Sequence, residues 1–318
     1  MGLTIGVDIG GTKLAAGVVD EAGNILERIH RPTPDGDADS VTAIFVDVVK
    51  EFRSRHQIDA IGIGVAAMID ATRSQVLFAA NLGWIDVPLR ATVETKTGLP
   101  TVIENDANAA AWGEFRFGAG RGVQHLAVVT VGTGLGCGVI VEGTIQHGFS
   151  GCASEVGHLR VVPGGLACGC GAHGCLEQYA SGDALVREAQ RLAETRKGDA
   201  TRLLALGDGT TEGIDGSHVT AAAGLGDPVA LAAFSYVGSW LGEGLASVTA
   251  VLDPACFVIG GGVSDAGDLL VGPTHDAYLD ALPARRFRTP GTIRLAELAN
   301  DAGLVGAGDL AHRRVDPV

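Results

Sequence analysis

The sequence predicts an α/β protein with two lobes. Strand-like apolar segments alternate with helix-like segments in two successive runs, which is the pattern of sheets covered by helices. The chain has 318 residues, a length that suits two domains of about 150 residues each. Its 48 glycines are roughly double the usual share, and many of them gather at strand ends. Such glycines indicate loops in which a ligand approaches the backbone closely.

The first run starts with three strands joined by turns and continues through alternating helices and strands. We expect strands over 3–8, 14–20, 24–31, 58–66 and 100–104, and helices over 38–55, 88–97 and 107–117. The first helix follows from apolar residues at helical spacing, such as Val41, Phe45 and Val48. Pro88 lies near the start of the second helix, where proline is tolerated. Asp106 precedes the third helix at the N-cap position.

The second run repeats the opening of two strands around a turn, which indicates an internal duplication. We expect strands over 125–131, 138–142, 144–147 and 256–259, and helices over 176–195, 228–252 and 302–313. The long segment 228–252 contains Glu243, three serines and three glycines, so we predict a buried helix rather than a membrane span. The polar, glycine-rich segment 196–216 is predicted to be the least ordered, and the last helix is expected to pack on the N-terminal lobe.

The composition argues against nucleic-acid and membrane partners. With 23 basic and 37 acidic residues, the net charge of −14 opposes binding to a phosphate backbone. Local phosphate binding by backbone amides remains compatible with this charge. The N-terminus begins with an apolar strand rather than a signal peptide, and six cysteines in so long a chain do not make a disulfide scaffold. We therefore expect a cytoplasmic protein.

A histidine and three cysteines gather in one short segment. The set consists of His158, Cys168, Cys170 and Cys175, with Gly169, Gly171 and Gly174 interspersed and Glu155 and Glu177 on either side. Zinc favours thiolate and imidazole ligands in a tetrahedral shell, so the set predicts a closed, structural zinc site. The alternatives are a disulfide with one free thiol, or three buried apolar cysteines. The short Cys-x-Cys spacing and the lack of a secretory segment favour zinc.

Three glycine-rich turns follow strands and are suited to bind a nucleotide. They are Asp8-Ile9-Gly10-Gly11-Thr12-Lys13, Gly132-Thr133-Gly134-Leu135-Gly136 and Gly260-Gly261-Gly262. The first turn lacks the Walker A spacing, yet it offers backbone N–H groups, a hydroxyl and a lysine charge. Asp8 is placed to hold Mg²⁺ through water, because hard cations prefer oxygen ligands. A single glycine-rich turn of this kind more often has a structural role than a functional one. Three such turns at successive strand ends are hard to explain as three unrelated structural turns.

The segment Glu104-Asn105-Asp106-Ala107-Asn108 is the best candidate for the chemistry. Phosphoryl transfer to an alcohol needs a carboxylate near the attacking hydroxyl, together with positioning and charge neutralisation. Asp106 is suited to accept the proton, and Asn105 is suited to bind a neighbouring hydroxyl. The competing interpretation is that Asp106 only caps the helix.

Together these motifs resemble the ROK family of sugar kinases, in the family's order and over nearly the whole chain. The matching segments are DIGGTK, ENDANAAAWGE, VGTGLGCGVI, EVGH, CGCGAHGCLEQYASG and IGGGVS. The resemblance is greatest to the ATP-dependent members of Gram-positive, actinobacterial origin that phosphorylate glucose. It implies a two-lobed actin-like ATPase (ribonuclease H-like) fold with a ligand cleft between the lobes. The lobes would comprise residues 1–108 with the helix 300–318, and residues 109–299 with the zinc loop and the dimerisation surface.

The resemblance also implies a role for each site residue. Asp106 would deprotonate the 6-hydroxyl of D-glucose for attack on the γ-phosphate of ATP. The sugar would be bound by Ala67, Asn81, Asn105, Asp106, Glu155, His158 and Glu177, and His158 would also bind zinc. The nucleotide would be bound by Asp8, Gly10, Gly11, Thr12, Lys13, Gly132, Thr133, Gly134, Gly261 and Gly262. ATP, Mg²⁺ and structural zinc are the implied ligands, and a homodimer or homotetramer is the implied assembly.

Two departures from the family pattern and several alternatives remain open at this point. Cys137 replaces a glycine in the second turn, and Ala66-Ala67-Met68 replaces a more glycine-rich turn. N-acetylglucosamine, N-acetylmannosamine, mannose or fructose is the alternative substrate; polyphosphate is an alternative donor, which the Cys-rich loop disfavours. A non-catalytic sugar sensor is disfavoured by the intact Asp106. For a family repressor, we expect no room for a DNA-binding domain before the strand at Leu3.

Overall fold

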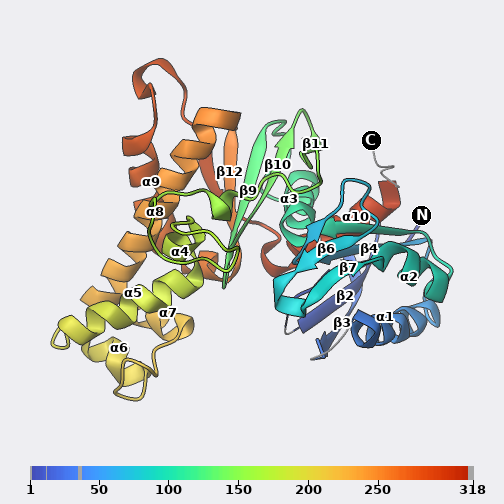
Figure 1. The fold of residues 1–318 in the computed structure, drawn as a ribbon, viewed down its shortest axis with the longest axis horizontal. Helices are drawn as coiled ribbons and strands as arrows, with labels where there is room; N and C mark the ends of the chain where they lie inside the picture. Colours follow the sequence, from blue (N-terminus) through green and yellow to red (C-terminus); the bar gives the residue numbers. More distant parts are fainter. Residues whose placement is uncertain (1, 12, 35–37, 314–318) are drawn as a thin grey trace. The chain divides into compact units, whose positions relative to one another are not determined.

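Strands and helices alternate along the chain in the computed structural model, which describes residues 2–11, 13–34 and 38–313 (Figure 1). The α/β class expected from the sequence is confirmed. The chain divides into two compact units. The first unit comprises Met1–Val128, Gly138–Ser154 and Glu297–Val318, and the second unit comprises Val129–Cys137 and Glu155–Ala296.

The first unit is built on a five-stranded sheet with the order β3-β2-β1-β4-β8. Its strands are β1 (Thr4–Ile9), β2 (Lys13–Val19), β3 (Ile25–Pro32), β4 (Ala60–Val65) and β8 (Thr101–Asn105). β1 is antiparallel to β2 but parallel to β4, which is in turn parallel to β8. Because side chains alternate along a strand, Ile5, Val7 and Ile9 point into one core, which α1 (Ala38–Arg53) and α2 (Leu89–Thr97) complete.

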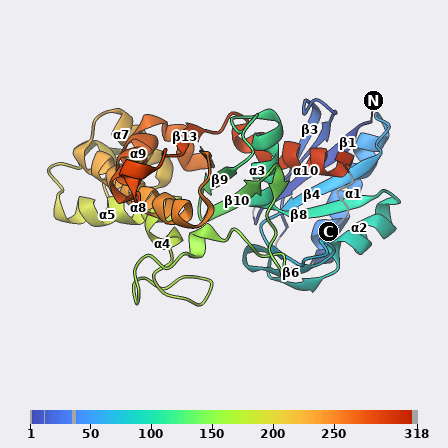
Figure 2. The same cartoon turned by 90° about the horizontal axis from the view of Figure 1, so that it is seen from above.

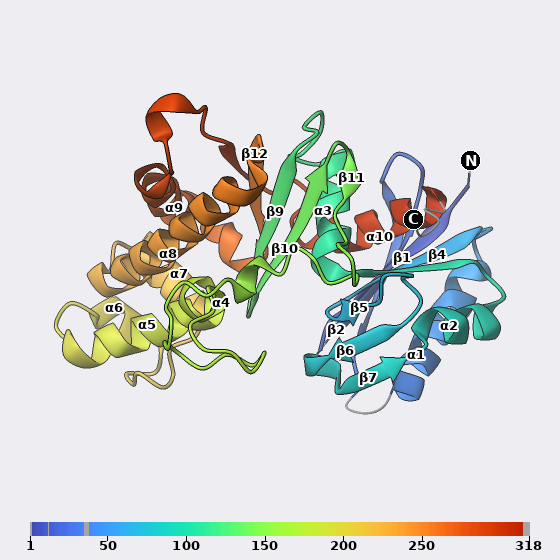
Figure 3. The ribbon, with the colours of Figure 1, turned by 45° about the horizontal axis from the view of Figure 1, so that its top comes forward.

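The other face of this sheet is covered by α10 (Ala302–Arg313), which also packs against α3 (Asp106–Phe117) (Figures 2 and 3). Glycines let the helix backbone touch the strands. A Cβ at Gly6 would lie 2.0 Å from the carbonyl oxygen of Leu304, and one at Gly62 would lie 1.8 Å from that of Ala307. Only a residue without a Cβ fits at such a distance. The prediction that the last helix packs on the N-terminal part of the chain is confirmed.

A small antiparallel sheet follows β4 and was not predicted from the sequence. It consists of β5 (Met68–Ile69), β6 (Val76–Ala79) and β7 (Trp84–Val87), with the one-turn helix η1 (Ala80–Leu82) between the last two strands. Strands of two to four residues are too short to give a clear alternation of apolar and polar side chains. This insertion carries Ala67 just before it and Asn81 within η1.

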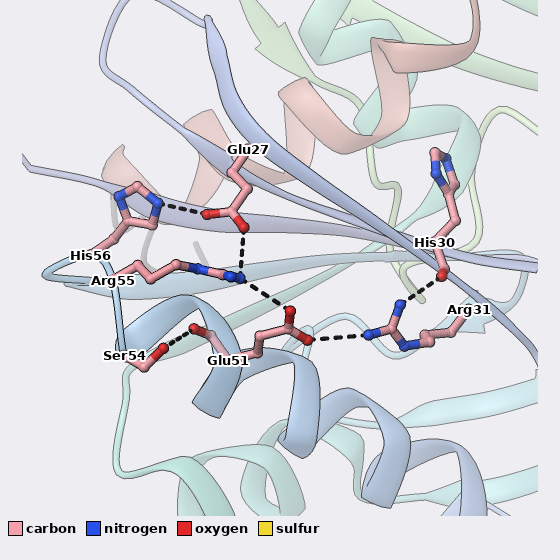
Figure 4. A network of polar contacts seen from close by, with 7 residues as sticks. All are labelled: Glu27, His30, Arg31, Glu51, Ser54, Arg55 and His56. Atoms are coloured by element: carbon pink, nitrogen blue, oxygen red, sulfur yellow. Dashed lines mark hydrogen bonds and ion pairs between the residues drawn. The ribbon is translucent and has the colours of Figure 1, made fainter.

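The edge strand β3 is joined to the end of α1 by a network of charged side chains (Figure 4). Glu27 on β3 pairs with Arg55 at 2.6 Å and with the Nε2 atom of His56 at 2.8 Å. Arg55 also contacts Glu51, which pairs with Arg31 at 3.1 Å. Charged side chains on an edge strand discourage pairing with another chain.

The second sheet has the order β11-β10-β9-β12-β13. Its strands are β9 (Leu126–Val131), β10 (Leu135–Val141), β11 (Thr144–Ile145), β12 (Cys256–Gly260) and β13 (Thr292–Leu295). The two sheets share one strand order. In each sheet the first strand of the run lies at the centre, its second and third strands follow on one side, and its fourth and fifth strands follow on the other. β10 and β11 are antiparallel, whereas β12 and β13 are parallel. This agreement in strand order supports the predicted internal duplication.

The helices of the second unit depart from the predictions in four places. They are α4 (Glu177–Ala180), α5 (Gly182–Thr195), α6 (Thr201–Leu206), α7 (Gly216–Gly224), α8 (Pro228–Leu252) and α9 (Asp268–Ala281), with the short helices η2 (Val156–His158), η3 (Gly262–Ala266) and η4 (Arg285–Phe287); η5 (Ala299–Asp301) belongs to the first unit. The single helix predicted over 176–195 is interrupted at Ser181, whose side chain caps α5. The segment predicted to be least ordered contains α6, and α7 and α9 were not predicted. Among the described residues, no helix has the length and apolar character needed to cross a membrane.

Candidate active site

The carboxyl ends of three parallel strands bring several predicted site residues together in the first unit. Asp8 on β1 lies opposite Gly64 on β4, and Gly64 lies opposite Glu104 on β8. Asn105 and Asp106 follow at once. Ligands of α/β proteins commonly bind at the carboxyl ends of parallel strands. The first glycine-rich turn and the Asn105-Asp106 segment are far apart in the sequence. They therefore meet at the carboxyl ends of neighbouring strands.

Asn105, rather than Asp106, is the N-cap of α3. Its side-chain oxygen accepts a hydrogen bond from the backbone N–H of Asn108 at 3.0 Å, and Asp106 is the first helical residue. The predicted cap position is therefore wrong by one residue. Because Asn105 satisfies the helix end, the interpretation of Asp106 as only a capping residue does not hold.

Two half-buried carboxylates, Asp8 and Asp106, lie near each other at the carboxyl end of these strands. Burial and the negative charge of Asp106 raise the pKa of Asp8 to about 7, although the charge of Lys13 acts in the opposite direction. Burial also raises the pKa of Asp106, against the backbone N–H groups of Ala107 and of Asp106 itself. A carboxylate with a raised pKa is suited to accept a proton near neutral pH.

The predicted sugar residues of the first unit lie around Asn105 and the first turn. The Nδ2 atom of Asn105 donates to the carbonyl oxygen of Ala67 at 3.2 Å. One N–H and one lone pair of the amide are left for a ligand. Asn81 is exposed and adjoins the first turn: a Cβ at Gly11 would lie 3.0 Å from the Cβ of Asn81.

The first glycine-rich turn is closed by backbone hydrogen bonds. The N–H of Gly10 donates to the carbonyl oxygen of Lys13 at 3.0 Å, and the hydroxyl of Thr33 donates to the carbonyl oxygen of Gly10 at 2.8 Å. Lys13 is exposed. Thr12, also predicted to bind the nucleotide, lies outside the described residues. This turn joins two strands, so it presents backbone groups without a helix N-terminus.

The predicted zinc ligands converge in the second unit. The ligand atoms of His158, Cys168, Cys170 and Cys175 all lie within 4.8 Å of one another. The Sγ atoms of Cys170 and Cys175 are 3.7 Å apart, as are the Sγ atom of Cys168 and the Nδ1 atom of His158. Two thiolates bound to one tetrahedral zinc at 2.3 Å would be about 3.8 Å apart. The four residues therefore fit a zinc ion, and all six cysteines, each in the described part of the chain, are free thiols.

Two of the three glycines in this loop have a left-handed backbone conformation. Gly171 and Gly174 have φ angles of +88° and +81°, and a Cβ at Gly174 would lie 1.6 Å from the carbonyl oxygen of Val162. Gly169 has neither a left-handed backbone nor a close neighbour. The turn therefore does not require glycine at this position.

The carboxylates on either side of the zinc cluster differ in their surroundings. Glu177, at the start of α4, accepts a hydrogen bond from the backbone N–H of Leu135 at 3.1 Å and lies 3.7 Å from the Sγ atom of Cys168. Glu155 is exposed and immediately precedes η2, which ends at His158. Glu177 thus links the zinc cluster to the second glycine-rich turn.

The second and third turns pack against each other. The N–H of Gly132 donates to the carbonyl oxygen of Gly134 at 3.0 Å, and Thr133 between them is exposed. Gly261 has a φ angle of +82°, and a Cβ there would lie 2.6 Å from the carbonyl oxygen of Val131. Gly262 follows at the start of η3, with no neighbour crowding its Cβ position. Backbone groups of both turns are therefore close to each other, as a nucleotide site requires.

Cys137, which stands where the resemblance led us to expect a glycine, is buried. It is 6% exposed. Burial and the negative charge of Glu155 raise the pKa of its thiol to about 12. A thiol in such surroundings is a poor nucleophile, so Cys137 is not a candidate for the chemistry of the site.

The sequence did not indicate a cluster around Glu104. This carboxylate lies within hydrogen-bonding distance of the Nε2 atom of His147, at 2.7 Å, and pairs with Arg73 at 3.5 Å. The available signal was a glutamate at the end of an otherwise apolar strand, where an ionisable side chain needs partners. Its partners are far away in the sequence and become neighbours only through the fold.

Known proteins resemble the chain over its whole length. The family model described as "ROK family" matches residues 4–314. A glucokinase of Streptomyces coelicolor is 50% identical, with all of both chains covered, and a glucokinase of Halalkalibacterium halodurans is 37% identical, with 98% of this chain and 95% of the relative covered. The crystal structure of a ROK family glucokinase from Streptomyces griseus, in complex with glucose and AMPPNP, superposes with a TM-score of 0.91 at 49% identity, covering 98% of this chain and 100% of that chain.

Proposed function

This chain belongs to the ROK family, and we propose that it is an ATP-dependent glucokinase, which transfers the γ-phosphoryl group of ATP to the 6-hydroxyl of D-glucose. The glucose and AMPPNP bound to a relative with 49% identity support both substrates. The structural observation that carries the proposal is Asp106. It is a carboxylate with a raised pKa, it follows the end of β8, and its neighbour Asn105 performs the helix capping.

In this proposal Asp106 accepts the proton of the 6-hydroxyl as the oxygen attacks the γ-phosphorus and the bond to the β-phosphate oxygen breaks. A positioned general base of this kind accelerates proton transfer by roughly 10²–10⁴-fold. The free N–H of Asn105 donates to an adjacent sugar hydroxyl, which fixes the orientation of the hexose. Glu155, His158 and Glu177 bind further hydroxyls.

The three glycine-rich turns bind the nucleotide. Backbone N–H groups of the first and second turns face the phosphates, and Gly261 and Gly262 leave space beside the adenosine. Mg²⁺, when bound, neutralises charge on the transferred phosphoryl group. Asp8 would hold the ion through water, and Lys13 would add a positive charge at the same turn.

The cluster of His158, Cys168, Cys170 and Cys175 holds a structural zinc. Its four protein ligands leave no open position for a substrate. The Nδ1 atom of His158 faces Cys168, so the Nε2 atom is left to bind a sugar hydroxyl. Zinc thereby fixes the ring that contacts the substrate.

Removal of zinc tests this role. Chelation is expected to lower the melting temperature and to weaken glucose binding together, because the loop loses its main constraint. Metal analysis, thermal unfolding and calorimetric glucose titration measure the three quantities. A metal-free protein that keeps its melting temperature and glucose affinity would contradict a structural zinc.

A substrate panel tests the activity. ADP release is measured with ATP and Mg²⁺ against glucose, mannose, fructose, N-acetylglucosamine and N-acetylmannosamine. We expect glucose to give the highest kcat/KM. Preference for another hexose would move the substrate while keeping the residue roles, and no release with any hexose would favour a sugar sensor or polyphosphate as donor.

A further inference from the structure

Glu104 is a carboxylate, 1% exposed, that immediately precedes Asn105 and Asp106. A buried carboxylate is stable only when it is paired and hydrogen-bonded. Its Oε1 atom accepts the backbone N–H of Asn105 at 3.0 Å and the side-chain Nδ2 of Asn108 at 3.1 Å. One oxygen therefore holds both the cap of α3 and the first turn of that helix.

The other oxygen of Glu104 contacts two basic side chains from segments that are distant in the sequence. The Nε2 atom of His147 lies 2.7 Å from Oε2, and Nη1 of Arg73 lies 3.5 Å from it. Arg73 is 5% exposed and has a φ angle of +49°, which is uncommon for a residue other than glycine. Asp70 fixes this turn by accepting the backbone N–H groups of Ser74 at 2.8 Å and Gln75 at 2.7 Å. The strained turn therefore directs Arg73 toward Glu104.

His147 belongs to a loop that packs against the start of the turn containing Arg73. Gly151 has a φ angle of +90°, and a Cβ there would lie 2.3 Å from the carbonyl oxygen of Ile69. The N–H of Ala153 donates to the carbonyl oxygen of His147 at 3.0 Å, which closes the loop. Three segments, residues 69–75, 104–108 and 147–153, are thus locked together around one carboxylate, and all belong to the first unit.

The charges within this cluster are compensated. Burial would raise the pKa of Glu104, but the hydrogen bond and charge of His147, the charge of Arg73 and the hydrogen bond from Asn108 hold it below its usual range. The carboxylate is therefore ionised at neutral pH and acts as an acceptor at both oxygens.

We propose that His147 and Glu104 are positioning residues for hexose binding: His147 fixes Glu104, and Glu104 fixes the backbone of Asn105 so that its free amide N–H points to a sugar hydroxyl. This inference rests on the proposed function, in which Asn105 contacts the sugar. Neither residue touches the reacting atoms. Loosening the pair alters the orientation of Asn105 and leaves the base and the nucleotide turns in place.

The test replaces His147 by phenylalanine, which keeps a ring but removes the donor. His147→Phe is expected to raise the glucose KM about tenfold, the cost of one lost hydrogen bond to a buried acceptor. The kcat and the KM for ATP are expected to stay within about twofold of the wild type, because only sugar binding is affected. His147→Gln, whose amide can donate to Glu104, is expected to restore most of the glucose affinity.

The chain offers a matched control in His56. Its Nε2 atom lies 2.8 Å from Glu27, and its side chain is 24% exposed, against 23% for His147. His56→Phe should leave the glucose KM unchanged. Equal glucose KM values for the two phenylalanine variants would overturn the inference, as would a His147→Phe variant that loses stability, kcat and ATP affinity together.

Amide exchange separates this inference from the proposed function. Exchange of the Asn105 and Asn108 backbone N–H groups, followed by NMR in the absence of substrate, is expected to become about tenfold faster in His147→Phe and to stay unchanged in His56→Phe. If the wild type turns over a different hexose, the kinetic comparison uses that hexose. If it turns over none, the proposed function fails, and unchanged exchange in His147→Phe would separately overturn the positioning of Asn105.

Discussion

Two His–Glu pairs in the first unit have nearly the same geometry but different surroundings. His147 and Glu104 are 2.7 Å apart, and His56 and Glu27 are 2.8 Å apart, with similar exposure of the histidine. The side chain of Glu104 is 2% exposed, whereas that of Glu27 is 27% exposed. Each glutamate also contacts an arginine, Arg73 in the buried cluster and Arg55 at the surface.

The difference shows that the burial of a His–Glu pair, rather than its geometry, decides how much the pair contributes to stability. Around Glu27, water can replace any partner that is lost, so the pair contributes at most about 1 kcal/mol. The side chain of Glu104 is almost fully buried, so loss of a partner leaves a buried charge less well compensated. The surface network ties an edge strand to a helix, whereas the buried cluster fixes the backbone of Asn105.

The largest expected effect is on the carboxylate next to the buried cluster. Asp106→Asn should lower kcat by roughly 10²–10⁴-fold while leaving glucose binding intact, because it removes the proton acceptor but keeps the shape of the side chain. Steady-state kinetics and calorimetric glucose titration measure the two effects. Asp47→Asn, at an exposed position of α1, is the control and should behave as the wild type. Retained turnover in Asp106→Asn would remove Asp106 from the mechanism.

The second expected effect compares the two glutamates directly. Glu104→Gln should lower the free energy of unfolding by about 3 kcal/mol, because it removes the negative charge from a buried ion pair. Glu27→Gln should lower it by less than about 1 kcal/mol, since its partners are exposed. Urea unfolding of both variants measures the difference. Equal losses would mean that burial does not distinguish the two clusters.

Much of the fold could be predicted because its signals are local. The bounds of α8 (Pro228–Leu252) were predicted, since Asp227 caps the helix and Pro228 occupies its first turn. By contrast, α9 contains Pro273 within the helix, and Pro273 packs where a Cβ at Gly238 of α8 would lie 2.7 Å away. Its helical conformation therefore depends on tertiary packing, which overrides the local preference of proline.

The site could be predicted only where single motifs carry the chemistry. The motifs containing Asp8, Asp106 and the zinc ligands could be recognised because each is contiguous or nearly so. The partners of Glu104 come from residues 73 and 147, on either side of it in sequence. Such a contact depends on the small β5–β7 sheet, whose short strands give no clear periodic pattern.

A third comparison concerns the pH dependence of stability, which is expected to differ in sign between Asp8 and Asp20. Burial and the charge of Asp106 raise the pKa of Asp8 from 3.8 to about 7. Between about pH 4 and 7 the unfolded chain has lost this proton while the folded chain keeps it, so this carboxyl group lowers stability as pH rises. Asp8→Asn should therefore be more stable than the wild type at pH 8 in Mg²⁺-free buffer, and the difference should vanish toward pH 4.

Asp20 provides the opposite case. Burial opposes ionisation there, but the hydrogen bonds from Asn24 and Ala22 and the charge of His312 together lower the pKa of the carboxyl group below 3.8. Its contribution to stability is present above that value and is lost as pH falls through the lowered pKa. Asp20→Asn should accordingly be less stable than the wild type at pH 8. Urea unfolding from pH 4 to 8 compares the variants, and a shift of both in the same direction at pH 8 would show that burial of Asp8 is not what sets its pH dependence.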